Sequence, residues 1–167
     1  MCSGNRNRCM SRNLNILLFI LVAAGAAFLL DHKVVLIESV EQGQPIGEFG
    51  GVSLRLEYAT TTTARELGLG GRVSIAPDEA MLFVFPLDDY YGFWMNNMLM
   101  PIDMFWLDDK GQVVSIEENV ATSTYPNVFY PDAPARYVLE TIAGFAQEHS
   151  IIIGTPLVLK NFPSVTE

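Results

Sequence analysis

The chain has 167 residues, of which 50% are hydrophobic and 17% are charged, and its formal net charge is −9 at pH 7. This length suits one ordinary domain plus an extra segment and argues against a multidomain enzyme. The part after residue 30 has 7 Lys and Arg against 19 Asp and Glu. It therefore lacks the clustered basic residues that nucleic-acid binding requires, and we predict no nucleic-acid partner.

The first predicted element is residues 14–30, an apolar run without charge. Its length is close to the roughly 20 residues that an α-helix needs to cross a bilayer. Three arginines, Arg6, Arg8 and Arg12, precede it with no acidic residue. By the positive-inside rule the N-terminus then stays in the cytoplasm and the rest lies outside. We predict a single-pass anchor in the cell membrane and an extracytoplasmic domain.

A cleaved signal sequence is the alternative interpretation of this run. The small residues 24–26, "AGA", match a signal-peptidase site, and cleavage near Ala26 would give a secreted or periplasmic protein. Residues 28–30, "FLL", continue the apolar run past that point, which favours the uncleaved anchor.

Both cysteines, Cys2 and Cys9, precede the apolar run, so the predicted exported part has none. Disulfides, a thiol nucleophile and Cys-ligated metals are therefore excluded there. The predicted organisation is a cytoplasmic basic tail (1–13), the membrane segment (14–30), a stem (31–50), a β-rich domain (51–162) and a C-terminal tail (163–167).

The predicted domain begins with short alternating segments. Residues 52–58 alternate apolar and polar side chains, which is typical of a strand with one solvated face. Residues 60–71 predict a short helix, capped by Thr61 or Thr62 and ended by glycines. The apolar run 80–86 predicts a strand covered on both faces and stopped by Pro86.

Further along, residues 108–111, "DDKG", predict a β-hairpin connection, and residues 121–134, with three prolines, predict a surface loop. A strand (135–142), a short helix (143–150) and a final strand (155–162) follow. Several short strands with two small helices indicate a mostly β (β-rich α+β) fold, either a compact antiparallel sandwich or a partly open barrel.

The stretch 92–106, "GFWMNNMLMPIDMFW", contains the candidate site residues. Strand alternation places Asp103 on one face with Phe105 and Leu107, and an unpaired carboxylate there would cost several kcal/mol. Asp103 could cap backbone amides, pair with an arginine, or form a polar anchor at the floor of a pocket. The adjacent pair Asn96 and Asn97 could make a turn, or one of the two amides could face a cleft beside Trp94.

Four methionines in this region, Met95, Met98, Met100 and Met104, carry the thioether sulfur that suits Cu(I). Pro101 interrupts their strand, and methionine fills irregular cores without any metal. We predict no metal and no cofactor.

Six short motifs together resemble the domain of unknown function 192 family. They are "GLGGR" (68–72), "MLFVFP" (81–86), "FWMNN" (93–97), "PID" (101–103), "GQVVSI" (111–116) and "ARYVLE" (135–140) followed by Gly144. The resemblance covers about residues 50–160 and implies a compact β-rich domain with short helices, often found behind a signal or anchor. No established activity comes with it.

Several positions match the residue types of the family pattern, and others depart from it. The matching residues are Arg65, Gly68, Arg72, Trp94, Met95, Asn97, Pro101, Asp103, Glu140 and Gly144. The departures are Gly70 for a usual Met, Ala80 for Gly, Asn96 for Lys, Met98 for Thr and Met100 for an aliphatic residue. Loss of the basic residue at Asn96 weakens any anionic-ligand site built around it.

The interpretation that these patterns favour is a binding module with a cleft near Trp94, Asn97 and Asp103 for a small envelope ligand. The candidate ligand-binding residues are Arg65, Arg72, Trp94, Asn97, Asp103, Tyr137 and Glu140. One alternative is an envelope protein that binds another protein or serves a structural role. Another is a hydrolase with Asp103 and Glu140 as acid and base. No catalytic histidine or serine motif supports an enzyme, and no catalytic residue is assigned.

Overall fold

The structure is a computed structural model that describes residues 45–160. The predicted cytoplasmic tail, the membrane segment, most of the stem and the whole C-terminal tail lie outside these residues. Within residues 45–160, none of the helices is long and apolar enough to span a bilayer.

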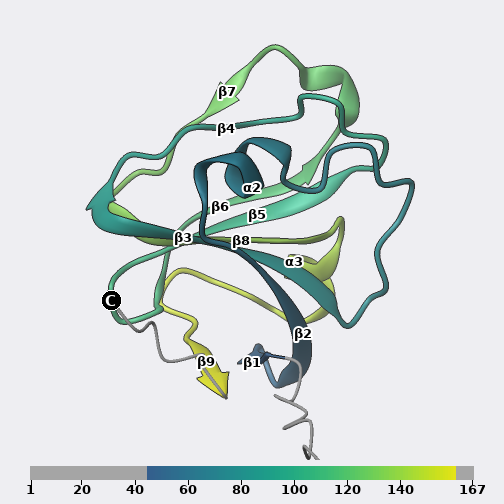
Figure 1. Ribbon diagram of the computed structural model, residues 1–167. Helices are drawn as coiled ribbons and strands as arrows, with labels where there is room; N and C mark the ends of the chain where they lie inside the picture. Colours follow the sequence, from purple (N-terminus) through teal and green to yellow (C-terminus); the bar gives the residue numbers. More distant parts are fainter. Residues whose placement is uncertain (1–44, 161–167) are drawn as a thin grey trace, which may run out of the picture. The chain divides into compact units, whose positions relative to one another are not determined.

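The domain is built on one curled seven-stranded sheet that forms half a barrel, so the predicted mostly β fold is confirmed (Figure 1). The strand order is β6-β5-β8-β3-β2-β1-β9, and a separate two-stranded ribbon pairs β4 with β7. Within residues 45–160 the strands do not form the alternative, a sandwich of two large sheets. The strands are β1 (Ile46–Phe49), β2 (Val52–Ala59), β3 (Glu79–Asp89), β4 (Phe93–Trp94), β5 (Ile102–Leu107), β6 (Val113–Val120), β7 (Val128–Phe129), β8 (Ala135–Ile142) and β9 (Leu157–Lys160).

The stem was predicted to extend to residue 50, but its last residues belong to the sheet. Residues 46–49 form β1, which pairs antiparallel with both β2 and β9. The short sequence "IGEF" between Pro45 and the glycine turn at residues 50–51 has too few residues for strand alternation to be visible.

One pair of neighbouring strands, β2 and β3, is parallel, and the other pairs in the large sheet are antiparallel. A parallel pair needs a crossover connection, which residues 60–78 provide with helix α2 (Thr62–Leu67). Thr61 caps this helix by accepting a hydrogen bond from Ala64 N, and Gly68 ends it at a φ of 51°. Both ends of the helix were predicted from the sequence.

Strand β3 continues past Pro86 to Asp89, so the prediction that Pro86 stops the strand is wrong. The pairing with β8 shifts register between Val84 and Asp89. Pro86 lies inside this irregular stretch, where a missing backbone N–H removes no ladder hydrogen bond.

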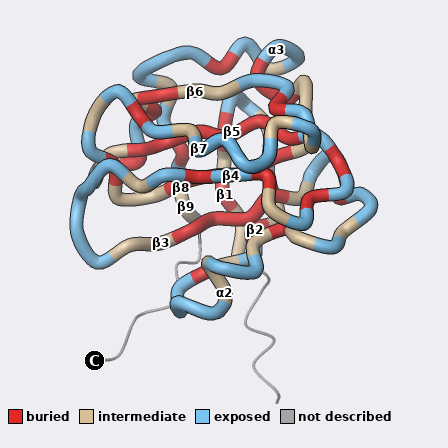
Figure 2. Tube along the Cα trace, turned by 90° about the horizontal axis from the view of Figure 1, so that it is seen from above, coloured by how far each residue is buried: buried red, intermediate tan, exposed pale blue. Residues whose placement is uncertain are grey.

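The sheet has an apolar core on each face, and β5 is buried at every residue because both faces are covered there. One face, here called the cavity face, carries Met81, Phe83, Met104, Trp106 and Val138. It packs against α2, Leu69 and residues 91–100. Figure 2 shows buried residues along the central strands and mainly exposed ones on α2.

The opposite face, here called the α3 face, packs against the short helix α3 (Phe145–Glu148). Its core contains Leu82, Phe105, Leu107 and Leu139 together with Phe145. The predicted hairpin between β5 and β6 is confirmed: Asp108 Oδ1 accepts hydrogen bonds from Lys110 N and Gln112 N.

The proline-rich stretch 121–134 contains a 3-10 helix, η1 (Thr122–Thr124), and strand β7. Strand β7 pairs with β4 through Phe93 and Phe129. This ribbon holds residues 91–98 over the cavity face, and it positions the candidate site described next.

Candidate functional site

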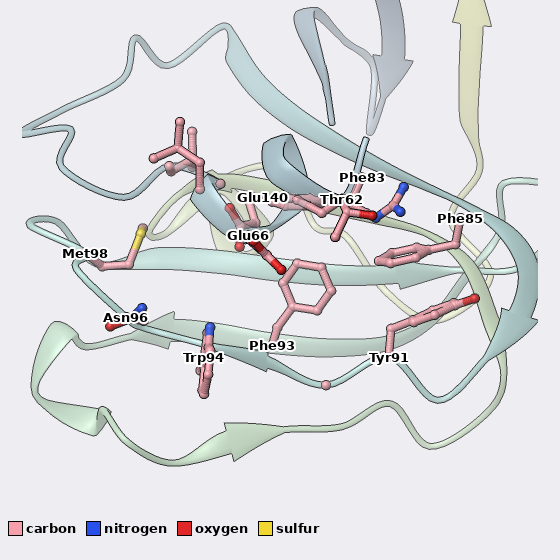
Figure 3. Close-up of a pocket in the computed structure, with 15 residues that line it drawn as sticks. Thr62, Glu66, Phe83, Phe85, Tyr91, Phe93, Trp94, Asn96, Met98 and Glu140 are labelled. Atoms are coloured by element: carbon pink, nitrogen blue, oxygen red, sulfur yellow. The ribbon is translucent and has the colours of Figure 1, made fainter. Parts of the chain in front are cut away.

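A cavity of about 550 Å³ lies between α2 and residues 91–98, above the cavity face of the sheet. This volume falls within the range of small-molecule sites. Figure 3 shows Phe85 and Tyr91 on one side of it and Asn96 and Met98 on the other. The residues that line it are Thr62, Arg65, Glu66, Leu67, Gly68, Leu69, Phe83, Phe85, Tyr91, Gly92, Phe93, Trp94, Asn96, Met98 and Glu140.

Glu140 is the most buried acidic group of this cavity, with 4% of its surface exposed. It lies on β8 between Met81 of β3 and Met104 of β5, both of them apolar. Among the described residues its Oε2 atom has no hydrogen-bond partner. A buried polar atom without a partner costs free energy, and this atom therefore has unused hydrogen-bonding capacity beside the cavity.

Burial raises the pKa of Glu140 from 4.5 to about 8, and the positive charge of Arg72 opposes this shift. Removal from water disfavours the charged form of a carboxyl group. At pH 7 the Glu140 side chain is therefore mainly a neutral carboxylic acid, which can donate one hydrogen bond as well as accept others.

Aromatic rings form the wall beside this acid. Phe85 stacks on Tyr91 with ring centroids 3.6 Å apart, and Phe83 meets Phe93 edge to face at 4.8 Å. Trp106 Nε1 donates a hydrogen bond of 2.8 Å to the backbone oxygen of Tyr91. Because Trp106 is fixed in the core, this bond anchors the start of residues 91–98 to the sheet.

Arg65 lines the cavity near the Phe85 ring. Its Nη1 atom donates to the backbone oxygens of Thr60 at 2.7 Å and Val84 at 2.9 Å. Its guanidinium carbon lies 5.1 Å from the centre of the Phe85 ring, a cation–π contact. Arg65 thus ties the crossover helix to strand β3 and places a positive charge at this end of the cavity.

Trp94 borders the cavity with 52% of its surface exposed, and its ring contacts that of Tyr125 at 6.1 Å. Trp94, Arg65 and Glu140, three of the predicted ligand-binding residues, are therefore brought together in one cavity. An exposed tryptophan at a cavity border offers a large flat surface to a bound molecule.

Asp103 lies elsewhere, and the prediction that it forms the floor of this cleft is wrong. It is fully buried on the α3 face, opposite Thr141 of β8. Its carboxylate accepts hydrogen bonds from Asn119 N at 2.7 Å, Gly144 N at 3.2 Å and Ala146 N at 2.8 Å. These are the backbone amides that the sequence offered as one alternative, and no arginine is among the partners.

This placement also excludes Asp103 and Glu140 as the acid and base of one hydrolytic site. Asp103 and Met104 point to opposite faces of β5, and Met104 is the cross-strand partner of Glu140. The sheet therefore separates Asp103 from Glu140, and the two carboxyl groups cannot flank one bond of a substrate.

Three further predicted residues lie outside the cavity. Arg72 makes a two-point ion pair with Glu57, with both nitrogen–oxygen distances at 2.8 Å. Asn97 is exposed in a turn at a φ of 55°, as its turn chemistry predicts. Tyr137 precedes Glu140 by three residues on β8, so its side chain points to the opposite face of the sheet and packs against the core of the α3 face.

Several residues of the cavity were not among the predicted ligand-binding residues, and they come from three segments: residues 91–98, α2 and β3. Of the two adjacent asparagines it is Asn96 that lines the cavity, together with Glu66 and Thr62 of α2. Phe83 and Phe85 were interpreted only as strand residues. The sequence did contain a signal for these two residues: they are two positions apart on one strand, which places both rings on the same face of the sheet.

The four methionines of residues 95–104 are all buried in the core of the cavity face. Their alternation with exposed Trp94, Asn97 and Leu99 shows that they attach residues 94–100 to the sheet. Among residues 45–160, no group of three or more His, Cys, Asp and Glu is arranged to hold a metal ion.

Two solved bacterial structures are similar to this domain. One, from Sinorhizobium meliloti 1021, is described as that of a candidate transcription regulator; it has 28% identity and a TM-score of 0.65, over 71% of this chain and 93% of that chain. The other, from Novosphingobium aromaticivorans DSM 12444, is of unknown function and has 26% identity and a TM-score of 0.62, over 68% of this chain and 82% of that chain.

Among curated proteins, none matches the chain. The profile of the domain of unknown function 192 family (DUF192), whose description is "Uncharacterized ACR", matches residues 46–159. The match includes every strand from β1 to β8, both helices and all the residues that line the cavity. The chain therefore belongs to this family.

Proposed function

We propose that this domain binds a small molecule with an apolar body and one polar group, which enters the cavity and meets Glu140. The observation that carries the proposal is the buried Oε2 atom of Glu140, which lacks a partner among the described residues and borders a cavity of about 550 Å³. A ligand that supplies this hydrogen bond removes the cost of leaving the atom unpaired.

The shape of the wall supports an apolar ligand body. Phe83 and Phe93 present ring edges and faces near Glu140, while Trp94 adds an exposed flat surface at the border. Sites of this kind combine many apolar contacts with a few polar groups that fix orientation. The predicted cleft thus keeps Trp94 but has Glu140, rather than Asp103, as its main polar group.

The similarity to a candidate transcription regulator does not lead us to propose nucleic-acid binding. Residues 45–160 contain six Lys and Arg against 15 Asp and Glu. Arg72 and Arg136 are already engaged by acids, so few cations remain to neutralise phosphates.

The experiment is a thermal-shift screen of the full-length protein against aromatic and aliphatic fragments that each carry one polar group. A ligand that binds only the folded state raises the melting temperature. Thr62→Trp fills the cavity from its exposed border, whereas Thr63→Trp, one residue along and outside the cavity, is the matched control.

We expect fragments to stabilise the wild type and Thr63→Trp but not Thr62→Trp. The proposal fails if no fragment stabilises the wild type, or if Thr62→Trp responds as strongly as the control.

We also propose that the domain lies outside the cytoplasm, attached through residues 14–30. The support is the uncharged run and the arginines that precede it. Protease added to intact cells should digest the domain while a cytoplasmic marker survives. Digestion only after the cells are lysed would contradict this placement.

A protein partner is the second candidate, and the exposed aromatic pair of Trp94 and Tyr125 favours it. Tyr125 contacts Trp94 but does not line the cavity. Tyr125→Ser should therefore weaken a protein complex while leaving fragment binding unchanged, which separates the two candidates.

A further inference from the structure

The acidic group at the centre of the cavity is surrounded by apolar side chains. Glu140 is more than nine-tenths buried, and its neighbours across the sheet are Met81 and Met104. Figure 3 shows Glu140 and Glu66 between the Phe93 ring and helix α2. Within residues 45–160 neither acid makes an ion pair.

Two arginines lie near this cavity, Arg72 with an electrostatic effect on Glu140 and Arg65 in the lining, and both are already engaged. Arg72 is held by both carboxylate oxygens of Glu57. Arg65 donates to two backbone oxygens and lies over the Phe85 ring. The described part of the chain thus provides two acids in the cavity, Glu66 and Glu140, without a cation that pairs with either.

We propose that the natural ligand of this cavity is a small organic amine, whose ammonium group donates a hydrogen bond to Glu140 while its aromatic or aliphatic body lies against Phe93 and Trp94. This inference rests on the proposed function and adds the chemical class of the ligand. An ammonium group is attracted both by a carboxylate and by the faces of aromatic rings.

The charges within the cavity fix the orientation of the amine. Arg65 repels an ammonium group from the Phe85 and Tyr91 side, so the charged group lies toward Glu140 and Glu66. An anionic group would meet Glu66 at the border of a domain in which acids outnumber Lys and Arg. A neutral alcohol could bond to Glu140 but would gain nothing from Glu66.

Amine binding requires Glu140 to release its proton. Burial raises the pKa of Glu140 to about 8, so at pH 7 the free protein holds the acid mainly as –COOH. In the complex the ammonium keeps its three protons, the carboxyl O–H bond breaks, and the proton leaves to solvent. Binding at pH 7 is therefore accompanied by the release of close to one proton.

The test uses three probes with one hydrocarbon body: 3-phenylpropylamine, 3-phenylpropan-1-ol and 3-phenylpropanoate. Isothermal titration calorimetry of the full-length protein in a non-ionic detergent, in two buffers of different ionisation enthalpy, gives affinity and proton release. We expect the amine to bind about tenfold more tightly than the alcohol and the carboxylate more weakly than either, with proton release for the amine alone.

Two variants locate the effect. Glu140→Gln keeps the size of the side chain and should remove both the amine preference and the proton release, while the affinity for the alcohol changes less than about threefold. Glu66→Gln should reduce the preference for the amine only partly and leave proton release intact, because Glu66 is exposed.

The outcomes separate this inference from the proposed function. Equal binding of amine and alcohol, tighter binding of the carboxylate, or an amine preference that survives Glu140→Gln would overturn the amine proposal while the binding function stands. Failure of all three probes, together with failure of the fragment screen, would overturn both.

Discussion

Asp103 and Glu140 are two buried acids on adjacent strands, yet the fold treats them in opposite ways. Asp103 lies on the α3 face and accepts three backbone N–H groups. Glu140 lies on the cavity face, and its buried Oε2 accepts none from the described residues. Equal burial therefore does not mean equal role: the first acid satisfies the chain's own amides, whereas the second has hydrogen-bonding capacity left for another molecule.

Replacing Asp103 by Ala should have the largest effect on stability. The change leaves three buried amides without an acceptor, and hydrogen bonds to a charged group contribute about 1.5–3 kcal/mol each. We expect a loss of roughly 5 kcal/mol or more, which is enough to unfold many domains. Urea denaturation measures it, with Asp109→Ala on the exposed hairpin as the control. A variant as stable as this control would show that Asp103 is dispensable to the fold.

Glu140 should make the protein less stable as the pH rises. Its pKa is about 8 when folded, so between pH 4.5 and 8 the folded state retains a proton that the unfolded state has released. The free energy of unfolding should therefore fall by roughly 4 kcal/mol across this interval, with full stability below it. Urea denaturation at a series of pH values measures the slope.

Glu140→Gln removes the titrating group and should flatten most of this slope. Burial, with a smaller contribution from Asp132, also raises the pKa of Glu117, so a weaker slope of the same sign should remain. Glu118→Gln, an exposed neighbour, is the control. Parallel slopes in the wild type and Glu140→Gln would mean that Glu140 is hydrated and not destabilised by burial.

The smallest effect should come from Thr61→Ala at the start of α2. This helix is capped by a residue adjacent in sequence, through the hydrogen bond from Ala64 N to Thr61 Oγ1. Loss of such a cap costs about 1 kcal/mol. The start of α3 instead relies on Asp103, 41 residues before Gly144. A change in melting temperature no larger than that of Thr63→Ala would show that the cap is not needed.

Local patterns predicted most of the fold. Thr61 and Gly68 marked both ends of α2, and the "DDKG" turn marked the hairpin between β5 and β6. These features depend on backbone conformations that particular residue types favour, so they can be identified in a single sequence. Strand β1 and the continuation of β3 past Pro86 were not predicted. Both depend on pairing with strands that are distant in the chain, β9 and β8.

The site was predicted only in part, and the reason lies in strand pairing. Parity along one strand shows which residues share a face, but it does not show which face is open. Asp103 is an acid among apolar residues, and this pattern fits a pocket acid and a structural acceptor of backbone amides equally well. Glu140 became distinguishable only when its register opposite Met104 placed it on the cavity face.

The buried methionines of residues 95–100 have a consequence for how narrowly this protein selects its ligand. One wall of the cavity is attached to the sheet by the side chains of Met95, Met98 and Met100. These long, unbranched thioether side chains can change conformation at little cost in packing energy. Such a wall can shift slightly to accept molecules of different thickness. Selectivity should therefore be strict for the charge of the ligand's head and tolerant of the dimensions of its body.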